Sequence, residues 1–242
     1  MSLPLLLLLR RLLIMLSAGW LAAVAAPALA ADPPGKVADT IEQRMLACAA
    51  CHGKQGEGIK KNEYYPRLAG KPAGYLFNQL MHFREHRREI PIMTYMVAYL
   101  SEPYLREIAE YYADLRPPYP PPARGAPPAL LARGEALVTK GDPSKSIPAC
   151  AACHGTALTG MAPAIPGLVG LDVNYVAAQM GAWKNDLRHA EAPDCMAQVA
   201  QRLAPDDISA AAAYLAAQPA NPAMLPVAAK SYALPLKCGR IE

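Results

Sequence analysis

Cys48-Ala49-Ala50-Cys51-His52-Gly53 occurs a second time in the chain, as Cys150-Ala151-Ala152-Cys153-His154-Gly155. Both copies are C-x-x-C-H, the attachment signature of c-type haem. Two thiols on one helical turn can add to the two vinyl groups on one edge of a porphyrin, and the adjacent histidine then reaches the iron. The alternative is a redox C-x-x-C pair or half of a zinc site. Two copies in matching surroundings favour two covalently bound haem c groups. The cofactor-binding residues are then Cys48, Cys51, Cys150 and Cys153, with His52 and His154 on the irons.

The residues around the two motifs reveal an internal duplication. Further along from each motif, the segment Pro66–Gly70 matches Pro166–Gly170 at an offset of 100 residues. Three larger side chains match at the same offset: Tyr75, Gln79 and Phe83 correspond to Tyr175, Gln179 and Trp183. The spacing of four is helical, so these three lie on one face of a helix in each half. Each half is therefore predicted to run helix, C-x-x-C-H, proline loop, helix, ligand loop, helix, with the last helices in 101–115 and 205–218.

The duplication also selects a sixth iron ligand from the ten methionines. Met93 lies seven residues before Leu100, and Met196 lies seven before the equivalent Leu203. A methionine thioether opposite histidine favours reduced iron and suits electron transfer. We assign Met93 and Met196 as distal ligands. Met96 is the alternative in the first half, although Val199 occupies its position in the second.

Three further features of the duplicated segments carry expectations. A ligating histidine gives its other ring N–H to an acceptor, and the carbonyls of Pro66 and Pro166 are the candidates, with a turn-forming role as the alternative. Arg84 and Lys184 are equivalent and either offset haem propionates or are simply surface charges. The segment 82–88, which contains two histidines and three arginines, is predicted to be a solvated basic face.

The first 31 residues predict export. Arg10 and Arg11 precede an apolar run over 12–29, and Ala28-Leu29-Ala30 is a small-residue cleavage pattern. We interpret 1–31 as a signal peptide, which predicts a periplasmic protein without a membrane span, or a membrane-anchored one if the signal is uncleaved. Without the two signal arginines, 22 basic residues face 20 acidic ones. That balance gives no support for nucleic-acid binding.

At this point the chain resembles the dihaem cytochromes of the c4 type, through both C-A-A-C-H-G motifs, the paired proline segments, 75–84 and Met93 ahead of Leu100-Ser101. The resemblance implies an all-α fold of two tandem class I cytochrome c domains, each a small helical bundle around one His/Met haem. We expect the first domain over 32–116, a proline-rich linker over 117–128, and the second domain with a C-terminal tail over 129–242.

Two cysteines remain after haem attachment, Cys195 and Cys238. In an oxidising compartment they are expected to form a disulfide that fixes the tail to the segment carrying Met196. The alternative is that Cys195 ligates the second iron as a thiolate, as in thiosulfate-oxidising dihaem proteins, which the chain resembles more weakly.

The expected function is a carrier of single electrons rather than an enzyme, because each iron has a sixth ligand and no set of catalytic carboxylates accompanies them. Its expected partners are redox proteins: a terminal oxidase, a quinol-oxidising complex or a periplasmic dehydrogenase. The alternative is that the chain is a cytochrome subunit of such a dehydrogenase, or is itself one.

Overall fold

The computed structural model describes residues 38–59, 62 and 64–241. The predicted signal peptide at 1–31 lies outside them. The first half of the described chain contains five helices: α2 (Ile41–Arg44), α3 (Leu46–His52), α4 (Ala73–Arg84), α5 (Pro91–Val97) and α6 (Glu102–Asp114).

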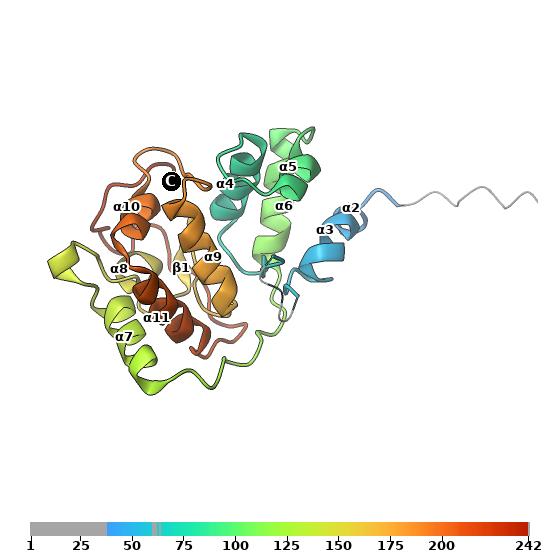
Figure 1. Cartoon of the computed structure of the whole chain (residues 1–242). Helices are drawn as coiled ribbons and strands as arrows, with labels where there is room; N and C mark the ends of the chain where they lie inside the picture. The colour runs from blue at the N-terminus through green and yellow to red at the C-terminus, as the bar shows by residue number, and fades with distance from the viewer. Residues whose placement is uncertain (1–37, 60–61, 63, 242) are drawn as a thin grey trace, which may run out of the picture. The chain divides into compact units, whose positions relative to one another are not determined.

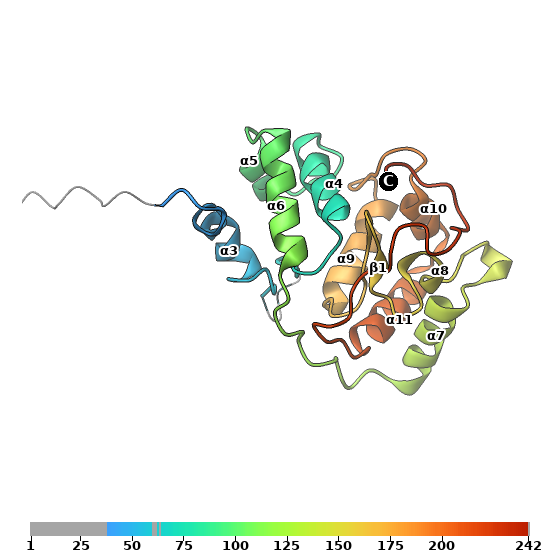
Figure 2. The same ribbon diagram turned by 180° about the vertical axis from the view of Figure 1, so that it is seen from behind.

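The second half repeats this order with additions (Figures 1 and 2). It contains α7 (Pro128–Thr139), the short 3-10 helix η1 (Pro143–Lys145), α8 (Ala151–His154), β1 (Gly160–Met161), β2 (Ile165–Pro166), α9 (Val173–Lys184), α10 (Cys195–Arg202) and α11 (Pro205–Ala216). The two strands pair antiparallel, with Gly160 opposite Pro166. The helices α3, α4, α5 and α6 correspond to α8, α9, α10 and α11. The predicted helical fold with a duplicated arrangement is confirmed. None of the helices in the described residues is long and apolar enough to cross a membrane.

Short polar side chains begin several of these helices. Ser101 accepts a hydrogen bond from the Tyr104 amide at the start of α6, and Asp194 accepts one from the Ala197 amide at the start of α10. Such caps satisfy amide groups that have no partner in the first turn of a helix. Within α6 the buried residues are Leu105, Ile108, Ala109 and Tyr112, the three-to-four spacing of an amphipathic helix.

The predicted ligand loops are wrong in one respect: both candidate methionines lie in helices. Met93 is in the first turn of α5, which begins at Pro91, and Met196 is the second residue of α10. Proline is well suited to the first turn of a helix because its missing N–H needs no partner there. In α10 the helix start is stabilised by Asp194, whose side chain accepts a hydrogen bond from the Ala197 amide. Both methionines are therefore held by helix starts rather than by irregular loops.

Each half has its own apolar core. In the first half, α4 packs against α6, and the most buried side chains include Leu105 and Tyr112. In the second half, α11 packs against α7 and α9, and Val138 and Ala212 are fully buried. The alanine-rich face of α11 lets α7 approach closely at Gly134, where an added Cβ would overlap the carbonyl oxygen of Ala210.

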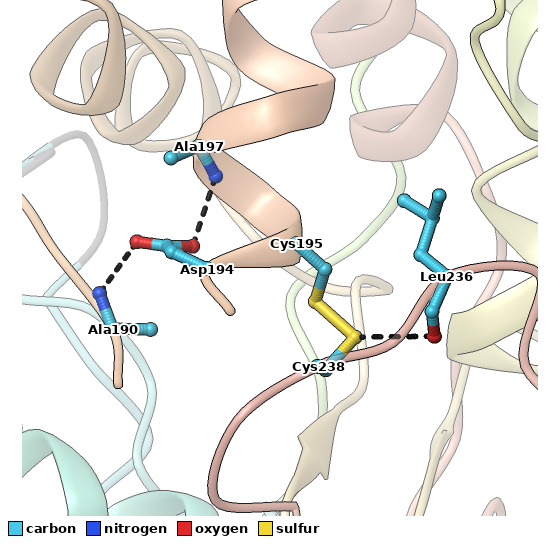
Figure 3. The surroundings of a disulfide bond; sticks show 6 residues. All are labelled: Ala190, Asp194, Cys195, Ala197, Leu236 and Cys238. Atoms are coloured by element: carbon cyan, nitrogen blue, oxygen red, sulfur yellow. Dashed lines mark hydrogen bonds between the residues drawn. A yellow bond between two sulfur atoms is a disulfide. The ribbon is translucent and has the colours of Figure 1, made fainter. Parts of the chain in front are cut away.

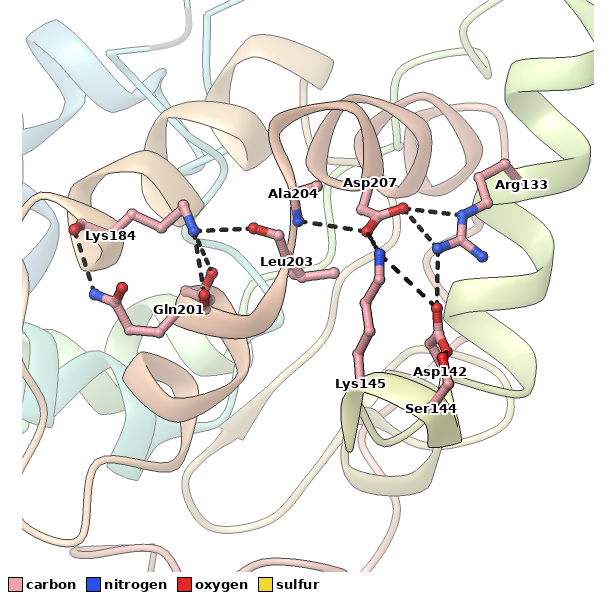
Figure 4. A network of polar contacts seen from close by, with 10 residues as sticks. Arg133, Asp142, Ser144, Lys145, Lys184, Gln201, Leu203, Ala204 and Asp207 are labelled. Atoms are coloured by element: carbon pink, nitrogen blue, oxygen red, sulfur yellow. Dashed lines mark hydrogen bonds and ion pairs between the residues drawn. The ribbon is translucent and has the colours of Figure 1, made fainter.

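A polar cluster connects η1 to helices α7 and α11 (Figure 4). Asp207 accepts hydrogen bonds from Arg133 Nη2 at 2.7 Å and from Lys145 Nζ at 2.8 Å, and Arg133 also reaches Asp142 at 3.1 Å. Burial of Asp207 opposes its ionisation, but the two cations outweigh this and hold its pKa below the usual value. The cluster fixes η1 on the α7–α11 pair.

The proline-rich segment between the halves is held by the first half. Arg67 donates to the carbonyls of Pro117 and Pro118, and its guanidinium lies 3.9 Å from the centre of the Tyr119 ring. On the other side, the Ala123 amide donates to the Ala216 carbonyl. The linker is thus anchored to the first half through Arg67 and to the second half through the Ala123 amide.

We predict that Gly134→Ala destabilises the protein by about 1–3 kcal/mol, because the new methyl group overlaps backbone that cannot move independently. Gly181→Ala in α9 is the matched control, since an added Cβ there meets no atom within 4 Å. Alanine favours a helix over glycine by up to about 1 kcal/mol, so this control should leave stability equal or raised. Denaturant unfolding measures both, and equal effects of the two substitutions would contradict the close α7–α11 contact.

Candidate haem sites

The four candidate ligands of the second half line a single cavity. Cys150, Cys153, His154 and Met196 all border it. They come from the start of α8, its end and the first turn of α10. Most of the remaining wall is apolar, including Leu137, Ile147, Leu168, Val176, Met180, Val199, Leu203, Ile208 and Leu215. Met196 is far from the other three in the sequence, and the folding of the second half brings it to the same cavity.

Both candidate histidines are oriented in the same way. The Nδ1 atom of His52 lies 3.0 Å from the carbonyl oxygen of Pro66, and that of His154 lies 2.7 Å from the oxygen of Pro166. A carbonyl can only accept, so Nδ1 carries the hydrogen and Nε2 keeps its lone pair for a metal. Burial lowers the pKa of both rings, which keeps them neutral. The predicted role of the two proline carbonyls is confirmed.

The paired thiols differ from those of a redox C-x-x-C motif. None of Cys48, Cys51, Cys150 and Cys153 is in a disulfide. Burial raises the pKa of Cys150 to about 11 and also raises the pKa of Cys48 and Cys153. Catalytic thiols of the redox type have lowered pKa values instead. This environment does not match that of an active dithiol, and it suits cysteines that end as thioethers.

In the first half, two methionines near the candidate site differ in burial. Met93 is partly buried against the same core cluster as Cys48. Met96 on the next turn of α5 is 36% exposed. Met93 is thus the more buried of the two, and its assignment as the ligand, which comes from the duplication, stays a prediction.

A disulfide joins Cys195 to Cys238 and holds the tail beside α10 (Figure 3). Cys195 is the residue before Met196, so the bond fixes the tail next to the candidate ligand. Leu234 and Leu236 of the tail line the cavity, and the Tyr232 hydroxyl donates to the Cys153 carbonyl at 3.1 Å. Because its sulfur is bonded to another sulfur, Cys195 is not a free thiolate that could ligate iron.

The first half completes the wall of the second cavity. Five of its residues border that cavity: Lys71, Tyr75, Asn78, Gln79 and His82. Burial and three neighbouring arginines lower the pKa of His82 to about 4, so the ring is neutral. The prediction of a solvated basic face is therefore wrong for His82 and for Arg88, which are 6% and 5% exposed.

Arg88 is buried because it forms a reciprocal contact with its equivalent, Arg188. Gln79 Oε1 accepts from Arg88 at 3.0 Å and from Arg188 at 2.9 Å, and Gln179 Oε1 accepts from both arginines at 2.7 Å. The two arginines also face each other in an antiparallel bridge. Within the described residues, neither guanidinium forms an ion pair with a carboxylate. Two like charges are thus buried at the junction of the halves.

Arg84 and Lys184 act at equivalent places, but on backbone. Arg84 donates to the Leu100 carbonyl at 3.0 Å, and Lys184 donates to the equivalent Leu203 carbonyl at 2.9 Å (Figure 4). Both cations therefore stabilise the chain just after the methionine-bearing helices, and Arg84 also pairs with Glu102. The expectation that they also offset haem propionates stays a prediction.

The second cavity suits a haem in three respects. Its wall is apolar, it presents a neutral histidine and a thioether, and the indole N–H of Trp183 is buried there without a partner. An unpartnered buried donor is costly, as is a buried guanidinium group without a counter-charge, and Arg188 also borders the cavity. The carboxylates of a haem are acceptors that would satisfy both kinds of group. The residues present therefore fit the cofactor.

Sequence reasoning missed the junction of the halves. Arg88 and Arg188 are related by the same offset of 100 that aligned the tyrosines, and this equality was the available signal. The contribution of Lys71 to the second cavity had no such signal, because its equivalent is Leu171.

A family model for cytochrome c matches residues 41–107. Similar proteins of known name include a thiosulfate dehydrogenase electron acceptor from Thiomonas intermedia, 38% identical over 216 residues, covering 88% of this chain and 93% of that protein. A cytochrome c4 from Pseudomonas aeruginosa is 32% identical and covers 72% of this chain and 85% of that protein.

Solved structures show the same likeness. Cytochrome c4 from Pseudomonas stutzeri has a TM-score of 0.64 at 28% identity, and covers 73% of this chain and 95% of that one. A thiosulfate dehydrogenase from Marichromatium purpuratum has a TM-score of 0.63 at 35% identity, and covers 71% of this chain but only 36% of that one. With two C-x-x-C-H turns and two helical halves, this chain belongs to the c4-type cytochromes, a family of electron-transfer proteins with covalently bound haem c.

Proposed function

We propose that the chain is an exported periplasmic carrier that binds two haem c groups and takes single electrons from a thiosulfate-oxidising dehydrogenase. The observation that supports this most strongly is the second cavity, in which Cys150, Cys153, His154 and Met196 line one apolar space. The first half repeats the motif, the histidine orientation and the methionine-bearing helix. A haem bound at each motif would supply an iron that accepts and releases one electron.

Two one-electron centres match the chemistry of the donor. Oxidation of two thiosulfate ions to tetrathionate forms one S–S bond and releases two electrons. Each centre takes one of them, and a later acceptor such as a terminal oxidase removes them one at a time. The relative from Thiomonas intermedia, whose name describes an electron acceptor of thiosulfate dehydrogenase, supports this donor.

The chain's own residues have three roles in this proposal. Four cysteines would tether the cofactors, His52 and His154 would offer neutral ring nitrogens to iron, and Met93 and Met196 would supply thioether ligands. A sixth ligand excludes substrate from the iron, which separates a carrier from an enzyme. The proposed layout is a signal peptide at 1–31, domains at 32–116 and 129–242, and the linker at 117–128.

The number of electrons that each chain takes up tests the proposed function. We expect the oxidised protein to take up two electrons per chain when thiosulfate and a catalytic amount of a thiosulfate dehydrogenase are added, as measured by haem absorbance. The double variant Cys150→Ala/Cys153→Ala should lose the second covalent haem, shown by intact mass. Cys48→Ala/Cys51→Ala is the matched variant for the first.

Thiosulfate alone should leave the protein oxidised, whereas ascorbate should reduce it. Reduction by thiosulfate without the dehydrogenase would show that the chain is itself the enzyme. If ascorbate reduces the protein but the dehydrogenase with thiosulfate does not, the proposed donor is rejected.

Replacing a ligand methionine should change one centre only. Met196→Ala removes the thioether and should lower the reduction potential of one haem, because methionine favours reduced iron. The redox equilibrium of that haem should shift more than tenfold toward the oxidised form. Met180→Leu is the control, since Met180 lines the same cavity and the change nearly conserves volume. In the first half, Met93→Ala should lower the reduction potential of the other haem, whereas Met96→Ala should leave it unchanged. Spectroelectrochemistry distinguishes these results, and an effect of Met96 alone would reverse the assignment.

The tail should control access to the second centre. In Cys195→Ser/Cys238→Ser, release of Leu234 and Leu236 from the cavity wall should increase the rate at which imidazole binds one of the two haems. Tyr64→Phe, at an exposed residue of the first half, is the control and should leave the rate unchanged. Stopped-flow absorbance gives the rates, and an unchanged rate in the serine variant would show that the tail does not restrict access.

A further inference from the structure

Lys71 belongs to the first half but reaches the histidine loop of the second. It precedes α4, and its Nζ atom donates to the carbonyl oxygen of Gly167 at 2.9 Å. The preceding residue, Pro166, accepts the hydrogen bond from His154 Nδ1. Lys71 also lines the second cavity. An ammonium group from one half therefore contacts the segment that orients the proposed iron ligand of the other.

The charge of Lys71 is not neutralised nearby. In the part of the chain that the structure describes, no carboxylate forms an ion pair with it. Burial, opposed in part by Tyr175 and assisted by the charge of Arg67, lowers its pKa to about 8. Most of the population therefore keeps the proton at pH 7. A charge without a counter-ion acts more strongly in such an environment than it would in water.

His154 is affected by this charge. The Nζ atom of Lys71 contacts Gly167, and the residue before it, Pro166, accepts the hydrogen bond from the His154 ring, so the charge lies close to that ring. A cation that disfavours positive charge on the ring also disfavours positive charge on a metal bonded to it. Its effect therefore extends along the histidine toward the site.

This arrangement exists on one side only. The equivalent of Lys71 is Leu171, an apolar residue that packs against the core of the second half and lines the same cavity. The first half does contain a buried cation near its own proline loop, Arg67, but that side chain is directed to the linker carbonyls of Pro117 and Pro118. Lys71 thus breaks the equivalence of the two halves.

We propose that Lys71 is a positioning residue for the second redox centre: the first half places its ammonium against the loop that orients His154, and the charge favours the reduced state of iron there. This rests on the proposed function, because it requires a haem at Cys150 and Cys153. Uptake of one electron from the donor removes one positive charge from the iron, while no bond forms or breaks. Repulsion by Lys71 is relieved in that step.

The test is Lys71→Gln in the full holoprotein. Glutamine can still donate to the Gly167 carbonyl but carries no charge. We expect the reduction potential of the second centre to fall by about 59 mV. For a one-electron couple this moves the equilibrium distribution of an electron between the two haems about tenfold away from the second centre. The second centre is identified as the one that Met196→Ala changes. The potential of the first centre should stay the same.

Two variants separate charge from structure. Lys71→Arg keeps the charge and should retain most of the potential, whereas Lys140→Gln removes a charge from an exposed residue of the second half and should have no effect because solvent screens it. Thermal unfolding of Lys71→Gln checks that the fold is intact. If Lys71→Met lowers the potential but Lys71→Gln does not, the hydrogen bond is responsible and the proposal is overturned.

The haem count keeps this test independent of the proposed function. Intact mass of each variant reports the number of attached haems. One haem per chain would reject the proposed function itself. Two haems with both potentials unchanged in Lys71→Gln would reject only the role of Lys71.

Discussion

The hydrogen bond from each motif histidine to a proline carbonyl is the constraint on which the rest of the molecule depends. It fixes a neutral ring with its Nε2 lone pair free, and it ties the C-x-x-C-H turn to the following loop at 3.0 Å in the first half and 2.7 Å in the second. The bundle then has to place a thioether opposite that ring. In the second half, α10 brings Met196 to the cavity that His154 lines, from a capped helix start beside the disulfide.

The two halves are related but not equivalent, and the differences concentrate around the second cavity. Its wall includes side chains from α4 and from the tail, so neither half alone completes it. The buried Arg88–Arg188 contact holds the halves together through two shared glutamine oxygens, although like charges oppose it. The Arg88–Arg188 contact therefore both holds the halves together and places positive charge near the second cavity. For a carrier with two centres, such a junction lets the charge state of one region influence the other.

Local chemistry determined how much could be predicted from the sequence. The attachment turns, the proline acceptors and the helix carrying Tyr75, Gln79 and Phe83 follow from short-range spacing and were predicted. Duplication extended this to Met93 and Met196, whose roles remain predictions. What failed depended on long-range packing: the charges of 82–88 suggested a solvated face, but Arg88 meets Arg188 across the junction. Likewise, Lys184 reaches backbone carbonyls that only the folded α9–α10 contact brings near it.

We propose above all that each half holds one iron, with a histidine and a methionine as its protein ligands. Electron paramagnetic resonance of the oxidised full-length protein tests this most directly, because spin state and ligand type are recorded for both centres at once. We expect two low-spin signals of the His/Met type in equal amounts. A high-spin signal, a thiolate-type signal or a single low-spin centre would contradict it.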